Sequence, residues 1–318
     1  MRRPATIPRM GSHQEDVIAA LRAEMPRAVR LAGAAACELR KHDVAVAGKE
    51  SGNANTDALT LADLSLQAML VTALRDCGDA VTGCRIQAEE ETGPLDAFAD
   101  DADLTLALDP IDGTRQFRDR TGEGWSVMLH LRTRTRVVYS LVLLPQKGPG
   151  QWVELAGEEV IVCDEDPARP AAELLAAAPR ITEATRKSGR GCYIIGFQSL
   201  DEGRAELLTS RGFRGYGPQQ MPSSVYPLMA TGEFCGSLIH TPNVYDFPVS
   251  LQIAERFGGG AMRCDTREPV DFSDVWLDEK SGMLRLRGII ACGDNPADLE
   301  TLCEIGKDWN PERYSEGM

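Results

Sequence analysis

The chain lacks the features that mark several classes of protein. Its longest apolar stretch, residues 137–145, is far shorter than the roughly 20 residues that a membrane-spanning helix needs. Its basic start, MRRPATIPRMG, has no apolar core, so we expect no secretory signal. The nine cysteines are dispersed and form no CxxC pair. This pattern favours reduced thiols, and therefore a cytoplasmic protein without a structural zinc site.

Histidine and positive charge are also scarce. The four histidines form no HExxH pattern, so any metal would be held by carboxylates, which prefer hard cations such as Mg²⁺. Lysine and arginine number 34 against 48 aspartates and glutamates, and the net charge is −14. A surface this negative repels phosphate backbones, which argues against general nucleic-acid binding.

The composition is that of a globular protein. The chain has 318 residues, 43% of them hydrophobic and 26% charged, which is enough for one large layered domain or about two smaller ones. We expect a flexible arm over residues 1–14 and two halves, 15–165 and 166–318, joined near 164–170. Helical and strand patterns alternate without a regular βαβ rhythm, which predicts a layered α+β fold.

Hydrophobic periodicity places the main elements. It predicts helices over residues 16–41, 60–74 and 224–231, and a further helix from Asp246 to the glycines at 258–260. Strands are expected over 104–108, 125–131, 136–144, 158–163, 192–197 and 234–239. Residues 41–57, rich in glycine, asparagine and charge, are expected to form a loop.

The strongest local signal is LTLALDPIDGT, residues 104–114. We expect the apolar strand to end at Asp109, where Pro110 interrupts the ladder. Asp112 follows three residues later, so two carboxylates can converge just beyond a rigid strand. Gly113 permits a tight turn, and Thr114 adds a hydroxyl and a backbone N–H that could face a phosphate. A short DxxDG turn is usually only a capped turn, but the full string favours a site.

Other acidic positions are weaker signals when each is taken alone. Glu89-Glu90-Glu91 is typical of a solvated loop, and Asp63 in TLTLAD is a polar helical position. Asp246 in NVYDFPVSL, with Pro248 behind it, is a good helix start. A carboxylate at a helix start can still bind a ligand with its second oxygen.

Taken in order, these motifs resemble the inositol monophosphatase superfamily, which includes adenosine 3′,5′-bisphosphate phosphatases and fructose-1,6-bisphosphatase. The resemblance covers roughly residues 15–265. It rests on Asp63, Glu89-Glu90, Asp109-Pro110-Ile111-Asp112-Gly113-Thr114, and Tyr245-Asp246 with Gly258-Gly259. It implies an αβαβα sandwich, two or three Mg²⁺ ions, sensitivity to Li⁺, and a homodimer.

The resemblance also implies roles for individual residues. Residues 15–165 would bind metal and residues 166–318 substrate, and Lys49 would lie in a mobile lid. The implied metal ligands are Glu89, Asp109, the Ile111 carbonyl, Asp112 and Asp246. The implied catalytic residues are Asp63 and Thr114, which would orient and deprotonate the attacking water, and Glu89, which could share a third ion. The implied substrate-binding residues are Gly113, Thr114, Ser223, Ser224 and Asp246.

Departures from the family pattern leave the substrate open. Tyr245 replaces the usual tryptophan, and Phe247-Pro248 replaces smaller residues. The segment RTGEGW, residues 120–125, looks more like relatives that act on adenosine 3′,5′-bisphosphate. We therefore predict a Mg²⁺-dependent phosphomonoesterase of the inositol monophosphatase type. Adenosine 3′,5′-bisphosphate, histidinol phosphate and sugar phosphates remain alternative substrates, and a catalytically silent metal-binding or scaffold protein is the alternative from another class.

Two other phosphatase motifs occur and are disfavoured. Asp101-Ala-Asp103-Leu-Thr105 matches the DxDx(T/V) pattern of haloacid-dehalogenase-type phosphatases, but the strand follows it instead of preceding it. Cys163 and Arg169 have the Cys-x5-Arg spacing of cysteine phosphatases. The residues between them are acidic, whereas a phosphate cradle needs glycines and free N–H groups.

Overall fold

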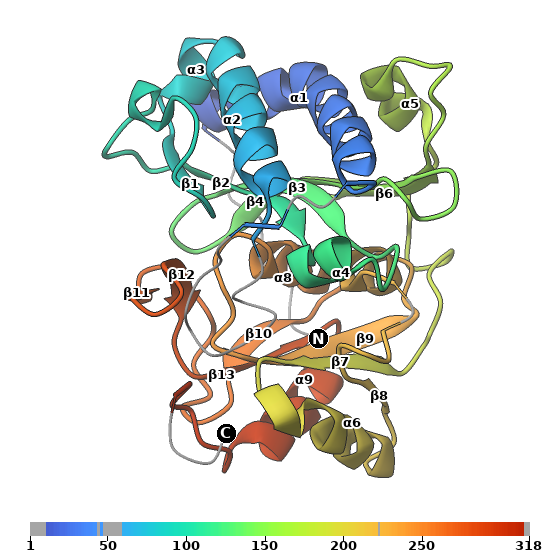
Figure 1. Cartoon of the computed structure of the whole chain (residues 1–318). Coiled ribbons are helices and arrows are strands. Elements are labelled where there is room, and N and C mark those ends of the chain that lie inside the picture. Colours follow the sequence, from blue (N-terminus) through green and yellow to red (C-terminus); the bar gives the residue numbers. More distant parts are fainter. Residues whose placement is uncertain (1–10, 43–44, 47–58, 222, 315–318) are drawn as a thin grey trace.

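The computed structural model describes residues 11–42, 45–46, 59–221 and 223–314. Their elements stack in the order helix, sheet, helix, sheet, helix (Figure 1). This arrangement confirms the layered αβαβα sandwich. The outer and middle helices are α1 (Ser12–Leu39), α2 (Leu61–Asp76), α3 (Asp79–Thr82), α4 (Thr114–Asp119), α5 (Ala171–Ala177), α6 (Asp201–Ser210), α7 (Val225–Ala230), α8 (Phe247–Arg256) and α9 (Pro296–Gly306). Short 3₁₀ turns occur at Leu95–Ala97 and Gln198–Leu200.

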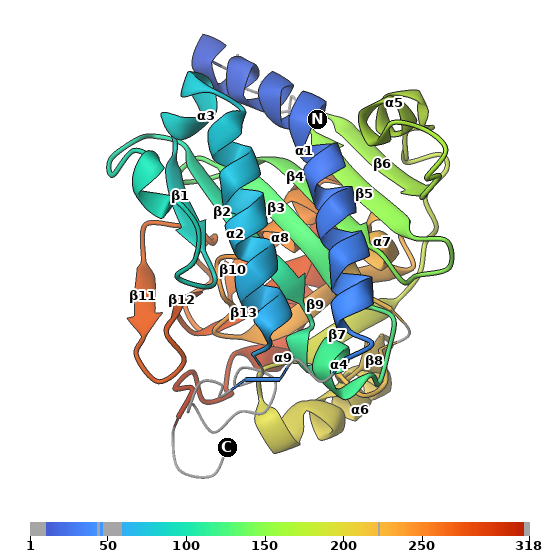
Figure 2. The ribbon, with the colours of Figure 1, turned by 45° about the horizontal axis from the view of Figure 1, so that its top comes forward.

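The first sheet separates the outer helices α1 and α2 from the middle helices α7 and α8 (Figures 1 and 2). Its strands, in spatial order, are β1 (Arg85–Ala88), β2 (Thr105–Asp112), β3 (Ser126–Arg132), β4 (Val137–Leu144), β5 (Gln151–Ala156) and β6 (Glu159–Asp164). β1 runs parallel to β2, and all other neighbours are antiparallel. Along β4, Leu141 and Leu143 pack toward α1 and α2, whereas Val142 packs toward the middle helices. Successive side chains of the strand point to opposite faces of the sheet, so they pack into two separate hydrophobic cores.

β2 continues further than the sequence predicted. Asp109 pairs with Met128 of β3, and Asp112 pairs with Ser126, with a shift of register between the two pairs. Pro110 lies in this irregularity, where the missing N–H of proline does not break a ladder bond. The prediction that the strand ends at Asp109 was therefore wrong. Both aspartates belong to a strand that β3 holds in place.

The second sheet is mixed and lies between the middle helices and the outer pair α6 and α9 (Figure 1). Its spatial order is β10 (Gly260–Arg263), β13 (Ile289–Gly293), β9 (Phe234–His240), β7 (Gly191–Ile195) and β8 (Arg214–Tyr216). β7 is parallel to β8 and β9, and the other pairs are antiparallel. A separate hairpin joins β11 (Val275–Asp278) to β12 (Met283–Leu286). This mixed order agrees with the α+β prediction.

The N-terminal boundary differs from the predicted one. α1 begins at Ser12, so residues 12–14, which we predicted as part of a flexible arm, are helical. Residues 1–10 of that arm, and Lys49 of the predicted lid, lie outside the described residues. No helix among the residues described is both long and apolar enough to cross a membrane.

The outer helix layer offers a test of the packing. Leu70 is fully buried on α2, whereas Leu61 on the same helix is 51% exposed. Leu70→Ala should lower the free energy of unfolding by about 2–5 kcal/mol, because it removes buried apolar contacts and leaves a cavity. Leu61→Ala should change it by less than about 0.5 kcal/mol. Urea unfolding of both variants measures this. Similar losses for the two would contradict the placement of α2 on the sheet.

Candidate metal and phosphate site

Two aspartates lie at the end of β2. Asp109 is buried, and its Oδ1 accepts a hydrogen bond from the Ile111 N–H at 2.9 Å. Asp112 Oδ2 accepts one from the Ser126 hydroxyl at 3.1 Å. Gly113 then turns the chain into α4 with φ +84°, in the left-handed region that glycine adopts at little cost. The strand, its neighbour and the turn therefore fix both carboxylates.

Asp63 on α2 approaches this motif through Thr114. The Thr114 hydroxyl lies 3.1 Å from Asp63 Oδ1 and 2.8 Å from the Ile111 carbonyl oxygen, and can donate to either. The other oxygen of Asp63 accepts hydrogen bonds from the N–H and the hydroxyl of Thr60, at 2.7 and 2.6 Å. This is a capping box at the start of α2. Burial raises the pKa of Asp63 to about 6, although the Thr60 hydrogen bonds act against the rise.

The acidic turn after β1 is held by Gln67, a buried residue one helical turn beyond Asp63. Its Oε1 accepts the Glu90 N–H at 2.7 Å, and its Nε2 donates to the carbonyls of Glu90 and Thr92. The Glu89 N–H donates to the Leu108 carbonyl at 3.3 Å, which extends the β1–β2 pairing. The turn is thus a fixed structure, and Glu89 lies in the cavity described below.

Asp246 comes from the second half of the chain and immediately precedes α8. Its side chain makes no capping bond to that helix. Instead, Asn243 Nδ2 donates to Asp246 Oδ2 at 2.8 Å, and Asn243 Oδ1 accepts the N–H groups of Tyr245 and Asp246 at 2.8 and 3.0 Å. The hydroxyl of Tyr245 accepts a hydrogen bond from the Leu284 N–H at 3.2 Å. Asn243 therefore orients the carboxylate, which does not cap the N-terminus of α8.

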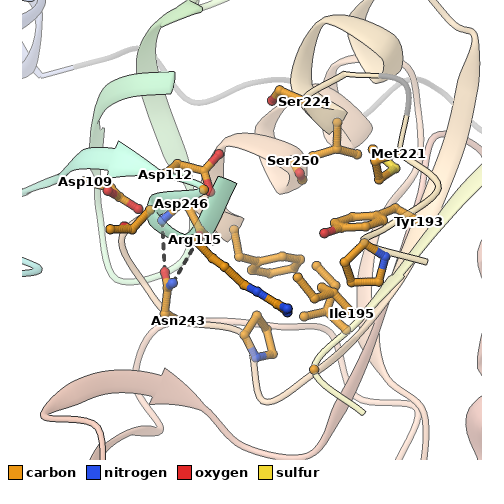
Figure 3. A pocket seen from close by; sticks show the side chains of 18 of the residues that line it. Asp109, Asp112, Arg115, Tyr193, Ile195, Met221, Ser224, Asn243, Asp246 and Ser250 are labelled. Carbon is orange, nitrogen blue, oxygen red and sulfur yellow. Dashed lines mark hydrogen bonds between the residues drawn. The ribbon is translucent and has the colours of Figure 1, made fainter. Parts of the chain in front are cut away.

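These elements bring three carboxylates together (Figure 3). Asp109, Asp112 and Asp246 each offer an oxygen within 4.8 Å of the others. Burial raises the pKa of Asp112 to about 6 and that of Asp246 to about 8, and it raises the pKa of Asp109 well above its usual value. Glu89 and the neighbouring aspartates raise the pKa of Asp109 further. Buried like charges at this separation are costly, and a cation held between them would offset the repulsion.

The donor chemistry of the cluster fits a hard divalent cation. All three side chains offer oxygen, and the Glu89 carboxylate and the Ile111 carbonyl face the same cavity. Mg²⁺ and similar ions prefer such oxygen ligands. The cluster could therefore bind a metal ion, and it draws on both halves of the chain.

A cavity of about 210 Å³ adjoins the cluster. The predicted site residues that line it are Glu89, Asp109, Ile111, Asp112, Gly113, Thr114, Ser223, Ser224 and Asp246. Asp63 lies behind Thr114 and is not part of the lining, and Glu90 is likewise outside it. The hydroxyls of Ser223 and Ser224 are buried and have no hydrogen-bond partner among the described residues. Buried polar groups are normally bonded, so these two are available to a ligand.

Sequence reasoning missed several residues of the site. Gln67 was predictable in principle, because it lies four residues after Asp63 on the same helical face. Asn243 lies three residues before Asp246, a spacing typical of side chains that bond to their own turn. Tyr193 of β7 and three arginines also line the cavity, but no local motif marks them. The arginines are Arg115, Arg285 and Arg313.

The two disfavoured phosphatase motifs do not form sites. Asp101 and Asp103 are exposed in the segment before β2 and do not line the cavity. Cys163 lies on β6, where burial and the nearby Glu165 raise the pKa of its thiol to about 11. A thiol with a raised pKa is a poor nucleophile near neutral pH.

The layered sandwich is a fold that this chain shares with solved bacterial proteins. SuhB of Bartonella henselae, an extragenic suppressor protein, matches with a TM-score of 0.61 and 14% identity, over 92% of this chain and 100% of its own. CysQ of Bacteroides thetaiotaomicron is described as a bacterial member of the inositol monophosphatase family. It matches with a TM-score of 0.60 and 18% identity, over 89% of this chain and 98% of its own. An IMPase of Thermotoga maritima matches with a TM-score of 0.58 and 15% identity, over 88% of this chain and 94% of its own.

The sequence itself carries the family assignment. The family model described as "Inositol monophosphatase family" matches residues 16–281, and the chain belongs to this family. The match confirms the resemblance that the motifs indicated. A search of curated protein sequences gave no significant match.

The carboxylate cluster predicts a response to divalent cations. Mg²⁺ in excess should raise the melting temperature by several degrees, because binding to the folded state stabilises it. Asp109→Asn should abolish most of that rise. Without cations at pH 7 the variant should be at least as stable as the parent, because a carboxyl whose pKa is raised in the folded state costs stability when it ionises.

Asp101→Asn is the control for this experiment, because Asp101 is exposed and lies outside the cavity. It should retain the full response to Mg²⁺. Calorimetric melting with and without the cation measures all three proteins. An undiminished rise in Asp109→Asn would contradict the assignment of the cluster.

Proposed function

We propose that the protein is a Mg²⁺-dependent phosphomonoesterase that hydrolyses a small phosphorylated metabolite. The observation that carries the proposal is the convergence of the three-carboxylate cluster, Glu89 and the Thr114–Asp63 pair around one cavity. Membership in the inositol monophosphatase family supports it. Inositol monophosphates are the first substrates to test.

The residues that would hold Mg²⁺ are Glu89, Asp109, the Ile111 carbonyl, Asp112 and Asp246. Together they offer oxygen ligands for two or three ions. Bound Mg²⁺ supplies charge neutralisation for the phosphoryl group and activates water as a nucleophile.

Thr114 and Asp63 would position the attacking water. When the Thr114 hydroxyl donates to Asp63, its lone pairs remain free to accept a hydrogen bond from a water in the cavity. As the water oxygen attacks phosphorus and the ester bond breaks, the water proton passes to the Thr114 oxygen, and the Thr114 proton moves to Asp63. The leaving alkoxide takes a proton from solvent water, and Asp63 returns its proton to solvent. A pKa of about 6 keeps Asp63 largely ionised at neutral pH and ready to accept this proton.

The substrate would be held from both halves of the chain. Gly113 and Thr114 come from residues 15–165 and could bond the phosphate through their backbone N–H groups. Ser223 and Ser224 come from residues 166–318, and their unpartnered hydroxyls could bond the substrate. Adenosine 3′,5′-bisphosphate, histidinol phosphate and sugar phosphates are the alternative substrates. Sensitivity to Li⁺, a homodimer and a cytoplasmic location stay predictions from the resemblance.

A panel of phosphate-release assays tests the proposal. Inositol 1-phosphate, adenosine 3′,5′-bisphosphate, histidinol phosphate and fructose 1,6-bisphosphate are supplied with Mg²⁺, with and without Li⁺. We expect release from at least one substrate, lost on chelation and restored by Mg²⁺. Binding of Mg²⁺ without release from any of the four would favour the catalytically silent alternative.

Variants of the water-positioning pair test the mechanism. Asp63→Asn and Thr114→Val keep the shape of each side chain but remove the proton acceptor and the hydroxyl. Each should lower kcat by about 10²- to 10⁴-fold, the usual effect of losing general acid–base catalysis. Thr72→Val is the matched control, because the Thr72 hydroxyl bonds only back to its own helix at the Ala68 carbonyl. Equal kcat values in all three would refute the assigned roles.

A further inference from the structure

The segment that follows α9 packs against loops at the cavity. It runs from Trp309 to Tyr314 and lies beyond residues 16–281, which the family model matches. The Trp309 ring meets the Phe197 ring edge-on, with the ring centroids 5.2 Å apart. The guanidinium of Arg204, on α6, lies 4.0 Å from the centre of the Phe197 ring and 4.2 Å from that of Trp309. The segment is thus anchored on α6 and on the turn after β7.

A closed ring of hydrogen bonds joins this segment to the end of β9. The Asn310 carbonyl lies 3.1 Å from His240 Nε2, and because a carbonyl can only accept, Nε2 donates. Burial lowers the pKa of His240 to about 4, so the imidazole is neutral at pH 7 and its Nδ1 can accept the Thr241 hydroxyl at 3.2 Å. The Thr241 oxygen in turn accepts a hydrogen bond from Arg313 Nη1 at 3.0 Å, and the same nitrogen lies 3.1 Å from the His240 carbonyl oxygen. These bonds fix the segment and the end of β9 relative to each other.

Asp278, at the end of β11, anchors the segment from its other side. One oxygen of this buried carboxylate accepts the Tyr314 hydroxyl at 2.8 Å and Arg285 Nε at 2.9 Å, and it lies 3.7 Å from Arg313 Nε. Burial raises the pKa of Asp278, but the hydroxyls of Ser281 and Tyr314 and the charge of Arg285 hold it below its usual value, so the carboxylate is ionised. Removing one partner of a buried ion pair is costly, so these contacts resist displacement of the segment.

The turn held by these contacts leads directly to Asp246. Thr241 has φ +44°, a conformation that a β-branched residue keeps only when its surroundings enforce it. Arg285 Nη1 donates to the Thr241 carbonyl at 3.1 Å, while Arg313 bonds the Thr241 hydroxyl. Two residues further on, Asn243 donates to the Asp246 carboxylate (Figure 3). The charge of Arg285 also acts on Asp246, whose pKa it lowers against the larger effect of burial. Contacts therefore run without a break from Arg313 to Asp246.

We propose that Arg313 is a positioning residue of the metal site, which acts through the Thr241–Asn243 turn to hold Asp246 where it can bind a cation. This inference rests on the proposed function, because it concerns the same metal site. A purely structural role for Arg313 would lower the stability of the fold and leave the affinity for Mg²⁺ unchanged. Loss of a residue that orients a metal ligand typically weakens metal binding by about 10- to 100-fold. Affinity for Mg²⁺ therefore separates the two roles.

Calorimetric titration with Mg²⁺ tests this inference on the full chain. Arg313→Met removes the guanidinium but keeps an apolar stem, and it should raise Kd for Mg²⁺ about tenfold or more. Arg313→Lys should recover part of the affinity. Arg30→Met is the matched control, because Arg30 on α1 also pairs with a carboxylate, Glu165, at 2.6 Å and with a carbonyl, that of Arg169, but does not line the cavity. An unchanged Kd in Arg313→Met, or an equal rise in Arg30→Met, would overturn the inference.

Two further substitutions test the route from Arg313 to the carboxylate. Thr241→Val keeps the branched shape but removes the hydroxyl that Arg313 bonds, so it should also raise Kd for Mg²⁺. If Arg313→Met does not fold, Thr241→Val decides, and an unchanged Kd would refute the inference. Asn243→Ala removes the last contact of the route, so Arg313→Met should add little to its effect in the double variant. Fully additive losses would contradict a route through Asn243.

Failure of this inference can be told apart from failure of the proposed function. With a substrate that is cleaved, Arg313→Met should need more Mg²⁺ for half-maximal rate, and saturating Mg²⁺ should restore most of kcat. An unchanged requirement for Mg²⁺ would overturn the inference and leave the proposed function intact. If no substrate is cleaved, the proposed function fails, and the calorimetric Kd values still decide the role of Arg313. Absence of Mg²⁺ binding in the parent protein would overturn both.

Discussion

The mutual repulsion of buried carboxylates is the constraint on which the rest of this structure depends. Asp109, Asp112 and Asp246 offer oxygens within 4.8 Å of one another, and Glu89 adds charge to the same cavity. Such a cluster raises the pKa of its members and opposes folding unless something holds it together or neutralises it. The surrounding scaffold holds the carboxylates together, and a bound cation could neutralise their charge.

A different structural element or hydrogen bond fixes each acidic residue in position. β2 and β3 fix Asp109 and Asp112, the side chain of Gln67 fixes the turn that carries Glu89, and Asn243 orients Asp246. The capping box at Thr60 does the same for Asp63. Because these supports come from separate layers, the site forms only when the first sheet, the outer helices and the second half of the chain have assembled. Ligands fixed by packing and hydrogen bonds need little rearrangement on binding, which is what a precise metal site requires.

The carboxylates that meet in the cluster were easier to predict from the sequence than several of the strands and helices around them. LTLALDPIDGT combines a strand, a turn and two carboxylates within eleven residues, so the position of these carboxylates can be predicted from this segment alone. β5 was missed because QWVELA is short and its pattern is indistinct, and β8, β10, β13 and α6 had no clear local signal. α9 was missed although Asn295 caps it and Pro296 opens it, which is a typical helix start. The end of β2 was misplaced because Pro110 usually stops a ladder, whereas here a shift of register accommodates it. Arg285 and Arg313 were missed because only tertiary structure brings residues near the C-terminus to Asp246.

The net charge of −14 argues against general nucleic-acid binding. The structure shows why an average charge is a poor guide to a site. Part of the acidity is concentrated in one cluster, where bound cations would reverse the local sign. Arg115, Arg285 and Arg313 line the same cavity. A phosphate group entering this cavity would therefore meet a local field of the opposite sign to that of the molecule as a whole, since potentials inside a cleft are set by its own walls.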